Sequence, residues 1–150
     1  MLNYTCLHFS DLVIEELFDI LALRQKIFIV EQKCIYQDAD SFDKNSWHVL
    51  GQDSYDSLLA YSRIIPNEYY AEKYINISRV LIASSIRNSG EGKILMNNTI
   101  EFTHNLFGKI PIKISAQTYL IKYYQNLGFE INGGTFLEDG IPHIAMILND

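Results

Sequence analysis

The feature that most constrains the fold is an apolar segment followed by two closely spaced glycines and an amphipathic segment. Positions 74–83 are rich in β-branched and apolar residues and predict a central strand. Gly90 and Gly92 follow, and apolar residues then recur at helical spacing as far as Gly108. The free amides and partial positive charge at a helix N-terminus are a natural seat for a phosphate. The pattern therefore predicts a strand, a phosphate-binding turn and a helix.

Other phosphate motifs do not fit this turn. The dinucleotide fingerprint requires a third glycine, but Lys93, Ile94 and Leu95 follow Gly92. A P-loop requires glycine at position 87, where this chain has Arg87. Arg-x-x-Gly-x-Gly remains, with positive charge on both sides of the glycines. Taken alone, this pattern is also compatible with a helix start that binds nothing.

The rest of the chain alternates short strands with helices. Further strands are predicted at 1–9, 47–52, 58–65, 111–115, 129–131 and 142–148, helices at 14–28, 90–108 and 117–127, and an acidic loop at 34–46. The order β-α-β-β-β-α-β-α-β-β predicts an α/β or α+β mixed sheet. The length of 150 residues fits a single domain spanning 1–150.

Composition excludes several classes of protein. Apolar residues make up 48% of the chain, yet no run is long enough to span a bilayer, and no secretion signal is visible, so we expect a cytoplasmic protein that does not bind membranes. The net charge of −6 and the absence of a basic stripe argue against nucleic acid. Cys6 and Cys34 predict no disulfide framework, and no His/Cys/Asp spacing predicts a metal site.

Several motifs together resemble one family. Arg87-x-x-Gly90-x-Gly92 after the strand is similar to the coenzyme A motif of the GCN5-related N-acetyltransferases (GNAT), and the segment 117–129, which ends in Gly-Phe, resembles their second motif. Segments 23–32, 36–40, 115–117 and 138–143 resemble the ElaA-like group of that superfamily. The resemblance extends over nearly the whole chain.

The resemblance implies a bent, mostly antiparallel sheet flanked by helices, in which two central parallel strands splay apart, here 74–83 and 111–115. It implies acetyl-CoA as cosubstrate, with its arm in the gap. The cofactor-binding residues that it implies are Val80, Leu81, Ile82, Arg87, Asn88, Ser89, Gly90, Glu91, Gly92, Lys93, Gln117 and Tyr124. Gln117 replaces the family's usual asparagine, with similar hydrogen-bonding groups.

The resemblance also assigns catalytic roles. Tyr124 stands four residues before Gly128, where the family has the tyrosine that acts as general acid; the alternative is a core tyrosine. The general base is open, because 110–114 carries no carboxylate. The candidates are Glu31, His48 and His143, each of which could instead be structural, and direct access to solvent is a further possibility.

The partner of the reaction is also open. The acceptor is expected to be a small-molecule amine or a peptide amine, and Asp38 and Asp40 weakly favour a cationic one. Arg63 and Arg79, on buried strands, are expected to pair with Glu31, Asp38 or Asp40. Cys34 is a poor nucleophile candidate because no histidine is near it in sequence. A longer acyl group, a homodimer, and a non-catalytic acyl-CoA-binding regulatory module on the same fold remain alternatives; nothing specific favours a DNA- or protein-binding regulator.

Overall fold

One mixed sheet forms the frame of the molecule. The computed structural model describes residues 1–70 and 73–149, and within them the strand order is β1-β2-β3-β4-β5-β8-β6, with β7 also paired to β8. The strands are β1 (Asn3–His8), β2 (Trp47–Gln52), β3 (Leu58–Ile65), β4 (Ile75–Ile82), β5 (Ile112–Gln117), β6 (Glu130–Ile131), β7 (Phe136–Glu138) and β8 (Ile141–Leu148). The strand pairs of the described residues are antiparallel except β4 with β5, which confirms the expected mostly antiparallel sheet.

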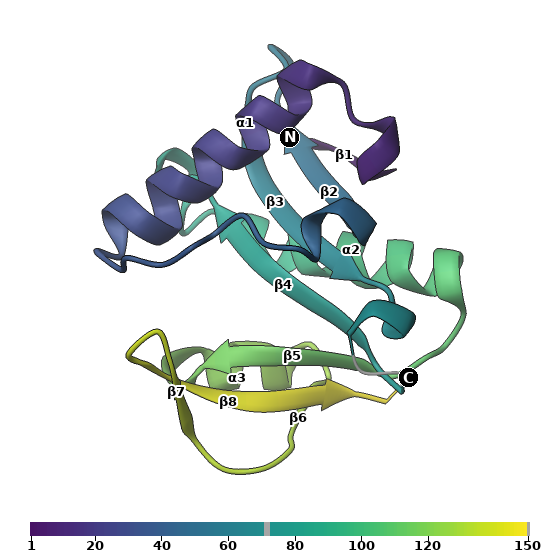
Figure 1. Ribbon diagram of the computed structural model, residues 1–150, viewed down its shortest axis with the longest axis vertical. Helices are drawn as coiled ribbons and strands as arrows, with labels where there is room; N and C mark the ends of the chain where they lie inside the picture. Colours follow the sequence, from purple (N-terminus) through teal and green to yellow (C-terminus); the bar gives the residue numbers. More distant parts are fainter. Residues whose placement is uncertain (71–72, 150) are drawn as a thin grey trace.

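The parallel pair is short, and its strands then separate. Ile75 pairs with Ile112 and Asn76 with Lys113, and the β4–β5 pairing of the described residues stops there. The side-chain amide of Asn76 donates to the carbonyl of Lys113 at 3.0 Å and closes this end. Figure 1 shows β4 and β5 diverging as a V from this point. The expected splay between two central parallel strands is confirmed.

A bulge bends β4 within the arm of the V. Arg63 on β3 pairs with Ser78, whereas Tyr61 pairs with Leu81, so β4 has one extra residue across this step. Arg79 lies in it with a φ of 53°. A bulge of this kind strengthens the local twist and changes where side chains point. It therefore directs β4 away from β5 at the level of the site.

Helices cover both faces of the sheet. α1 (Ile14–Arg24) continues as a π-helix, η2 (Gln25–Glu31), on one face, and α2 (Glu91–Phe107) and α3 (Ile121–Asn126) lie on the other (Figure 1). Gly108, with a φ of 76°, ends α2 and donates its amide to the carbonyl of His104 at 2.9 Å. No helix in the described part of the chain has the length and apolarity needed to cross a membrane.

Three local predictions were wrong. The α geometry of the first helix ends at Arg24, and the helix goes on to Glu31 with π spacing. Gln117 does not start a helix; it is the last residue of β5, because it pairs with His143 on β8. β7 was missed because its three residues are all exposed and lack a buried face, and pairing with β8 alone defines it.

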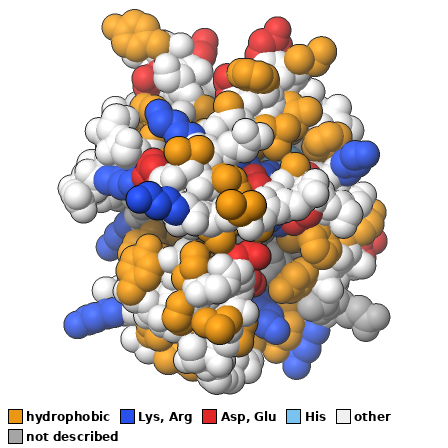
Figure 2. All heavy atoms as spheres, turned by 60° about the vertical axis from the view of Figure 1, so that its left-hand side comes forward, with side chains coloured by type: hydrophobic (Ala, Val, Ile, Leu, Met, Phe, Trp, Pro, Cys, Tyr) orange, Lys and Arg blue, Asp and Glu red, His pale blue; other side chains and the backbone are white. Residues whose placement is uncertain are grey.

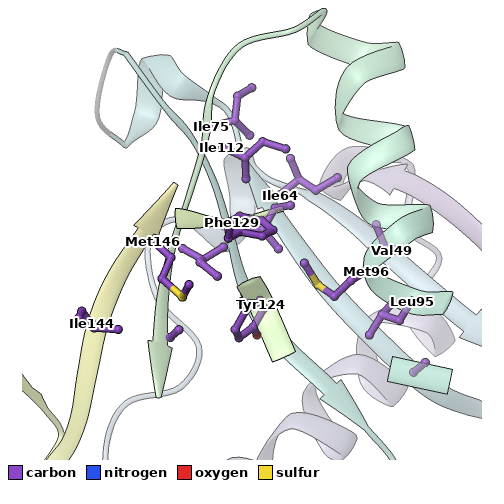
Figure 3. Close-up of a cluster of buried hydrophobic side chains, with 14 residues drawn as sticks. Val49, Ile64, Ile75, Leu95, Met96, Ile112, Tyr124, Phe129, Ile144 and Met146 are labelled. Atoms are coloured by element: carbon purple, nitrogen blue, oxygen red, sulfur yellow. The ribbon is translucent and has the colours of Figure 1, made fainter. Parts of the chain in front are cut away.

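The main core lies between the sheet and the helices α2 and α3. Its buried side chains include Ile64, Ile75, Met96 and Phe129, and Tyr124 reaches into it from α3 (Figure 3). Burial of each large aliphatic side chain stabilises the fold by roughly 1.5–3 kcal/mol. This core anchors α2 and α3 on the strands that diverge, so the opening of the V is held rigidly.

Candidate active site between the splayed strands

A cavity of about 450 Å³ lies where β4 and β5 diverge. Its walls come from β4, β5, β8, the segment 34–42, and the turn between β7 and β8. Of the residues expected at the site, it is lined by Val80, Gln117, Tyr124 and His143. Figure 2 is turned toward the open side of the V and shows acidic and apolar side chains between the upper and lower parts of this face. The cavity occupies the gap that the resemblance assigned to the acyl arm.

The glycine turn forms an uncapped helix start. Gly90 is the N-cap of α2 with a φ of 85°, and no side chain caps the helix. Helix geometry leaves the first amides of α2 without acceptors in the helix. A Cβ on Gly92 would lie 3.3 Å from the hydroxyl of Tyr123, whereas one on Gly90 would meet nothing within 4 Å. Glycine at position 90 therefore suits the left-handed backbone, and glycine at position 92 leaves room for the hydroxyl of Tyr123.

Neighbouring side chains near the end of β4, the strand before this turn, have different surroundings. Val80 faces the cavity, but the side chain of Leu81 is buried in a second cluster with Ile20 and Tyr61. Beyond Asn76, one edge of β4 is free of strand pairing in the described chain. That edge has backbone groups available for an extended ligand.

Arg87 is already engaged by the protein. Its guanidinium donates to Glu31 Oε1 at 2.8 Å and to the carbonyl of Ile82 at 3.2 Å. Glu31 is therefore at the glycine turn, and it does not line the cavity. The structure separates Glu31 from the expected role of general base and from the expected pairing with Arg63 or Arg79.

Tyr124 combines burial with an unused hydroxyl. Only 8% of the residue is exposed, and its ring packs edge-on against Tyr123 and Phe129. The described residues supply no hydrogen bond to its hydroxyl, yet no described buried polar atom is left unsatisfied, so this oxygen is accessible from the cavity that Tyr124 lines. Burial, with smaller effects of Tyr123 and Tyr119, raises the pKa of Tyr124 above the ordinary value for tyrosine. The hydroxyl keeps its proton at neutral pH and can donate it.

His143 has one nitrogen available on the cavity side. Its Nδ1 lies 2.7 Å from the carbonyl oxygen of Ile141, which can only accept, so Nδ1–H donates. The neutral ring then carries its lone pair on Nε2. Nε2 lies 3.5 Å from Glu138 Oε2, and Glu138 Oε1 lies 3.4 Å from the hydroxyl of Ser115. His143 has the geometry of a proton acceptor.

His48 is not at the site. It is 1% exposed, Nε2 donates to the carbonyl of Asp43 at 3.0 Å, and Nδ1 accepts from the hydroxyl of Tyr61 at 2.6 Å. Burial lowers the pKa of His48 to about 4, although interactions with Asp43 oppose this shift. The ring is neutral, both of its nitrogens are hydrogen-bonded, and it does not line the cavity, so this candidate base is wrong.

A buried ion cluster forms one wall of the cavity. Arg24, 0% exposed, donates to Asp38 at 2.8 Å and to Asp43 at 2.8 Å. Arg63 donates to Asp40 at 2.7 Å and to Asp43 at 2.9 Å. The expected pairing of Arg63 with the 38–40 segment is confirmed.

Arg79, in the bulge of β4, is the third arginine of this cluster. Arg79 donates to Asp38 at 2.8 Å and to Asp40 at 3.2 Å, as expected for a pair with these aspartates. Both aspartates are paired with arginines, which reduces the negative charge that they offer to a cationic acceptor. Sequence reasoning missed Arg24 and Asp43, although Arg24 lies between Ile20 and Ile27 on the buried face of its helix.

Cys34 lines the cavity, and its thiol lies 3.5 Å from the carbonyl oxygen of Asp139. No hydrogen bond joins it to a histidine of the described residues. Ser115 and Glu138 were quoted only as part of a resemblance and had no assigned role, because neither has a motif of its own. Glu138 reaches both Ser115 and His143 because β7 pairs with β8.

Comparison with known proteins finds relatives that match nearly the whole chain. Residues 26–149 match the family model described as an acetyltransferase (GNAT) domain. Protein ElaA of Escherichia coli is 36% identical over 148 residues, which cover 97% of this chain and 95% of ElaA. A UPF0039 protein of Synechocystis is 37% identical over 147 residues, which cover 97% of this chain and 94% of the relative.

Solved structures agree with the sequence relatives. An acyl-CoA N-acyltransferase from Pseudomonas aeruginosa matches with a TM-score of 0.93 at 37% identity and covers 98% of this chain and 99% of its own. The crystal structure of Escherichia coli ElaA matches with a TM-score of 0.91 at 35% identity, with the same coverage of 98% and 99%. The diverging strands and the glycine turn thus belong to a fold found in acyltransferases.

Proposed function

The chain belongs to the GNAT acetyltransferase family, and from this premise we propose that it transfers an acetyl group from acetyl-CoA to a primary amine. The observation that carries this proposal is the hydroxyl of the largely buried Tyr124, which has no hydrogen-bond partner among the described residues and is accessible at the cavity between β4 and β5. A proton donor at the point where two strands part suits the departure of a thiolate from a thioester.

The residues around the cavity fit the two ends of acetyl-CoA. The amides of residues 88–93, at the uncapped start of α2, suit a pyrophosphate. The free edge of β4 at 80–82 offers backbone groups to an extended pantetheine arm, and Gln117 lines the same gap. When bound, acetyl-CoA supplies the thioester carbonyl that the amine attacks.

The chain's own groups then move two protons. His143 Nε2 takes a proton from the acceptor ammonium, so that the nitrogen gains a lone pair for attack. As the new C–N bond forms and the C–S bond breaks, the Tyr124 O–H gives its proton to the sulfur. The amide nitrogen then loses its second proton, which restores the Tyr124 hydroxyl, and His143 releases the first proton to solvent. The products are an acetylated amine, free coenzyme A thiol and a proton released to solvent.

Gly90 offers a test of the phosphate-binding turn. Gly90→Val is expected to weaken acetyl-CoA binding about tenfold, because a side chain at a φ of 85° costs about 1–2 kcal/mol and shifts the amides of the turn. Isothermal titration with coenzyme A measures the affinity. Gly134→Val is the matched control, since Gly134 has no positive φ and a Cβ there meets nothing within 4 Å. Equal affinities of the two variants would contradict the assignment.

The transfer itself is tested by release of coenzyme A thiol from acetyl-CoA over a broad panel of amines and peptides. We expect thiol release that depends on the amine, with one acetylated product per thiol by mass spectrometry. Parallel assays with longer acyl-CoA thioesters define the acyl group. Tight binding of acetyl-CoA without thiol release from any acceptor would instead establish the non-catalytic acyl-CoA-binding module.

A further inference from the structure

The charges around the cavity determine which acceptor can bind. Among the described residues that line it, the lysines and arginines are Arg63 and Arg79. Both guanidinium groups are held by aspartates of the buried cluster, and Arg63 Nε also donates to Ser78 Oγ at 3.0 Å. The three arginines and three aspartates of that cluster balance in charge. The described wall has no free cation to pair with a carboxylate on a ligand.

Anionic groups are available at the opposite wall. Glu138, the last residue of β7, and Asp139, in the turn that follows, line the cavity. The side chain of Glu138 is 51% exposed, and its contacts at 3.4 Å to Ser115 and 3.5 Å to His143 are long. Unlike Asp40, Glu138 has no arginine partner in the described chain. Its carboxylate can accept hydrogen bonds from an ammonium group.

Aromatic rings line the same cavity as this carboxylate. Phe42 and Tyr70 line it and pack edge to face, with ring centroids 5.8 Å apart. Burial raises the pKa of Tyr70, and the charge of Glu138 adds to this shift. Aromatic faces attract cations and cover apolar bodies of ligands.

A second observation marks the same cavity as a place for a ligand. Tyr124 is 8% exposed, and its hydroxyl has no partner among the described residues and faces the cavity. Because this hydroxyl is not itself a buried unsatisfied atom, it is free to hydrogen-bond a group that enters the cavity. The acidic groups and this hydroxyl therefore line one cavity.

We propose that Glu138 is the specificity-determining residue of the acceptor site and selects a cationic primary amine that carries no carboxylate. The proposal rests on the proposed function. The ammonium donates to Glu138 next to His143, and the apolar body of the amine packs on Phe42 and Tyr70. A free amino acid is rejected because its carboxylate would face Glu138 and Asp139 with no unpaired cation in the described wall.

The test measures binding to the full chain saturated with coenzyme A, by isothermal titration, so that it does not depend on turnover. The three probes are phenethylamine, phenylalanine and phenylalaninamide; the amide adds size without negative charge. We expect phenethylamine and phenylalaninamide to bind about tenfold more tightly than phenylalanine, the effect of a hydrogen bond to a charged group.

Two variants test whether Glu138 is the group that binds the amine. Glu138→Gln is expected to weaken phenethylamine binding about tenfold, and Glu130→Gln, which removes an exposed carboxylate on β6 outside the cavity, is expected to leave it unchanged. Equal binding of phenylalanine and phenylalaninamide, equal effects of both variants, or no binding of the amines overturns the proposal. If this binding pattern holds but no amine releases thiol, the proposed function fails and the selection by Glu138 stands.

Discussion

Tyr124→Phe is expected to lower kcat for amine acetylation by about 100-fold, the loss typical of a general acid, and to leave the KM for acetyl-CoA unchanged. The substitution removes only the hydroxyl that faces the cavity, while the ring keeps its packing on Tyr123 and Phe129. The raised pKa of Tyr124 means that the lost group is a proton donor at every pH near neutrality. Steady-state thiol release with varied acetyl-CoA separates kcat from KM.

The control for this prediction is Tyr55→Phe. Tyr55 is 87% exposed, lies between β2 and β3, and does not line the cavity, so the same chemical change is expected to have no effect on kcat. The described residues make no hydrogen bond to the Tyr124 hydroxyl. Neither substitution is therefore expected to change the free energy of unfolding by more than about 1 kcal/mol. A Tyr124→Phe variant with the turnover of Tyr55→Phe rejects the role of Tyr124 as acid.

The fold was largely predictable because local and global signals agree in this chain. The strand at 74–83, the glycines and the amphipathic segment up to Gly108 each follow ordinary propensity, and the structure has a strand, turn and helix there. Their order along the chain, together with the family motifs, was enough to expect a parallel pair that splays. The bulge at Arg79 was not predictable, because it depends on the register of β4 against β3.

The site was less predictable, because its parts meet only through tertiary pairing. His143 and Gln117 were candidates from the motifs, and their pairing across β5 and β8 brings both to the cavity. Glu31 and His48 were also candidate bases from the sequence. Glu31 instead pairs with Arg87, and His48 is buried and hydrogen-bonded to Tyr61. A titratable residue in a motif indicates what chemistry is possible, and its partners decide whether that chemistry is available.

The buried ion cluster should dominate the stability of the wall opposite Glu138. Arg24 lies over the ring of Tyr61 at 5.8 Å and also donates to the carbonyl of Asp38 at 2.8 Å. Burial alone would raise the pKa of Asp43, but hydrogen bonds and charges of Arg24 and Arg63 outweigh it and lower this pKa to about 2. Asp43 is therefore ionised at neutral pH, and removal of an arginine leaves a buried negative charge without its full compensation.

Arg24→Met is accordingly expected to destabilise the protein by about 3–5 kcal/mol, measured as a fall in urea midpoint at unchanged m-value. Arg87→Met makes the same chemical change at a guanidinium that is 40% exposed and paired with Glu31, and should cost no more than about 1 kcal/mol. Arg24→Lys retains the charge without the forked geometry and should fall between the two. If Arg24→Met were no more damaging than Arg87→Met, the cluster would not be what holds the 38–43 segment against β4.

The loss of Arg24 should also affect ligand binding, because Arg79 and Asp40 of the same cluster line the cavity. A chain that loses Arg24 should therefore lose acceptor binding before it loses coenzyme A binding at the distant start of α2.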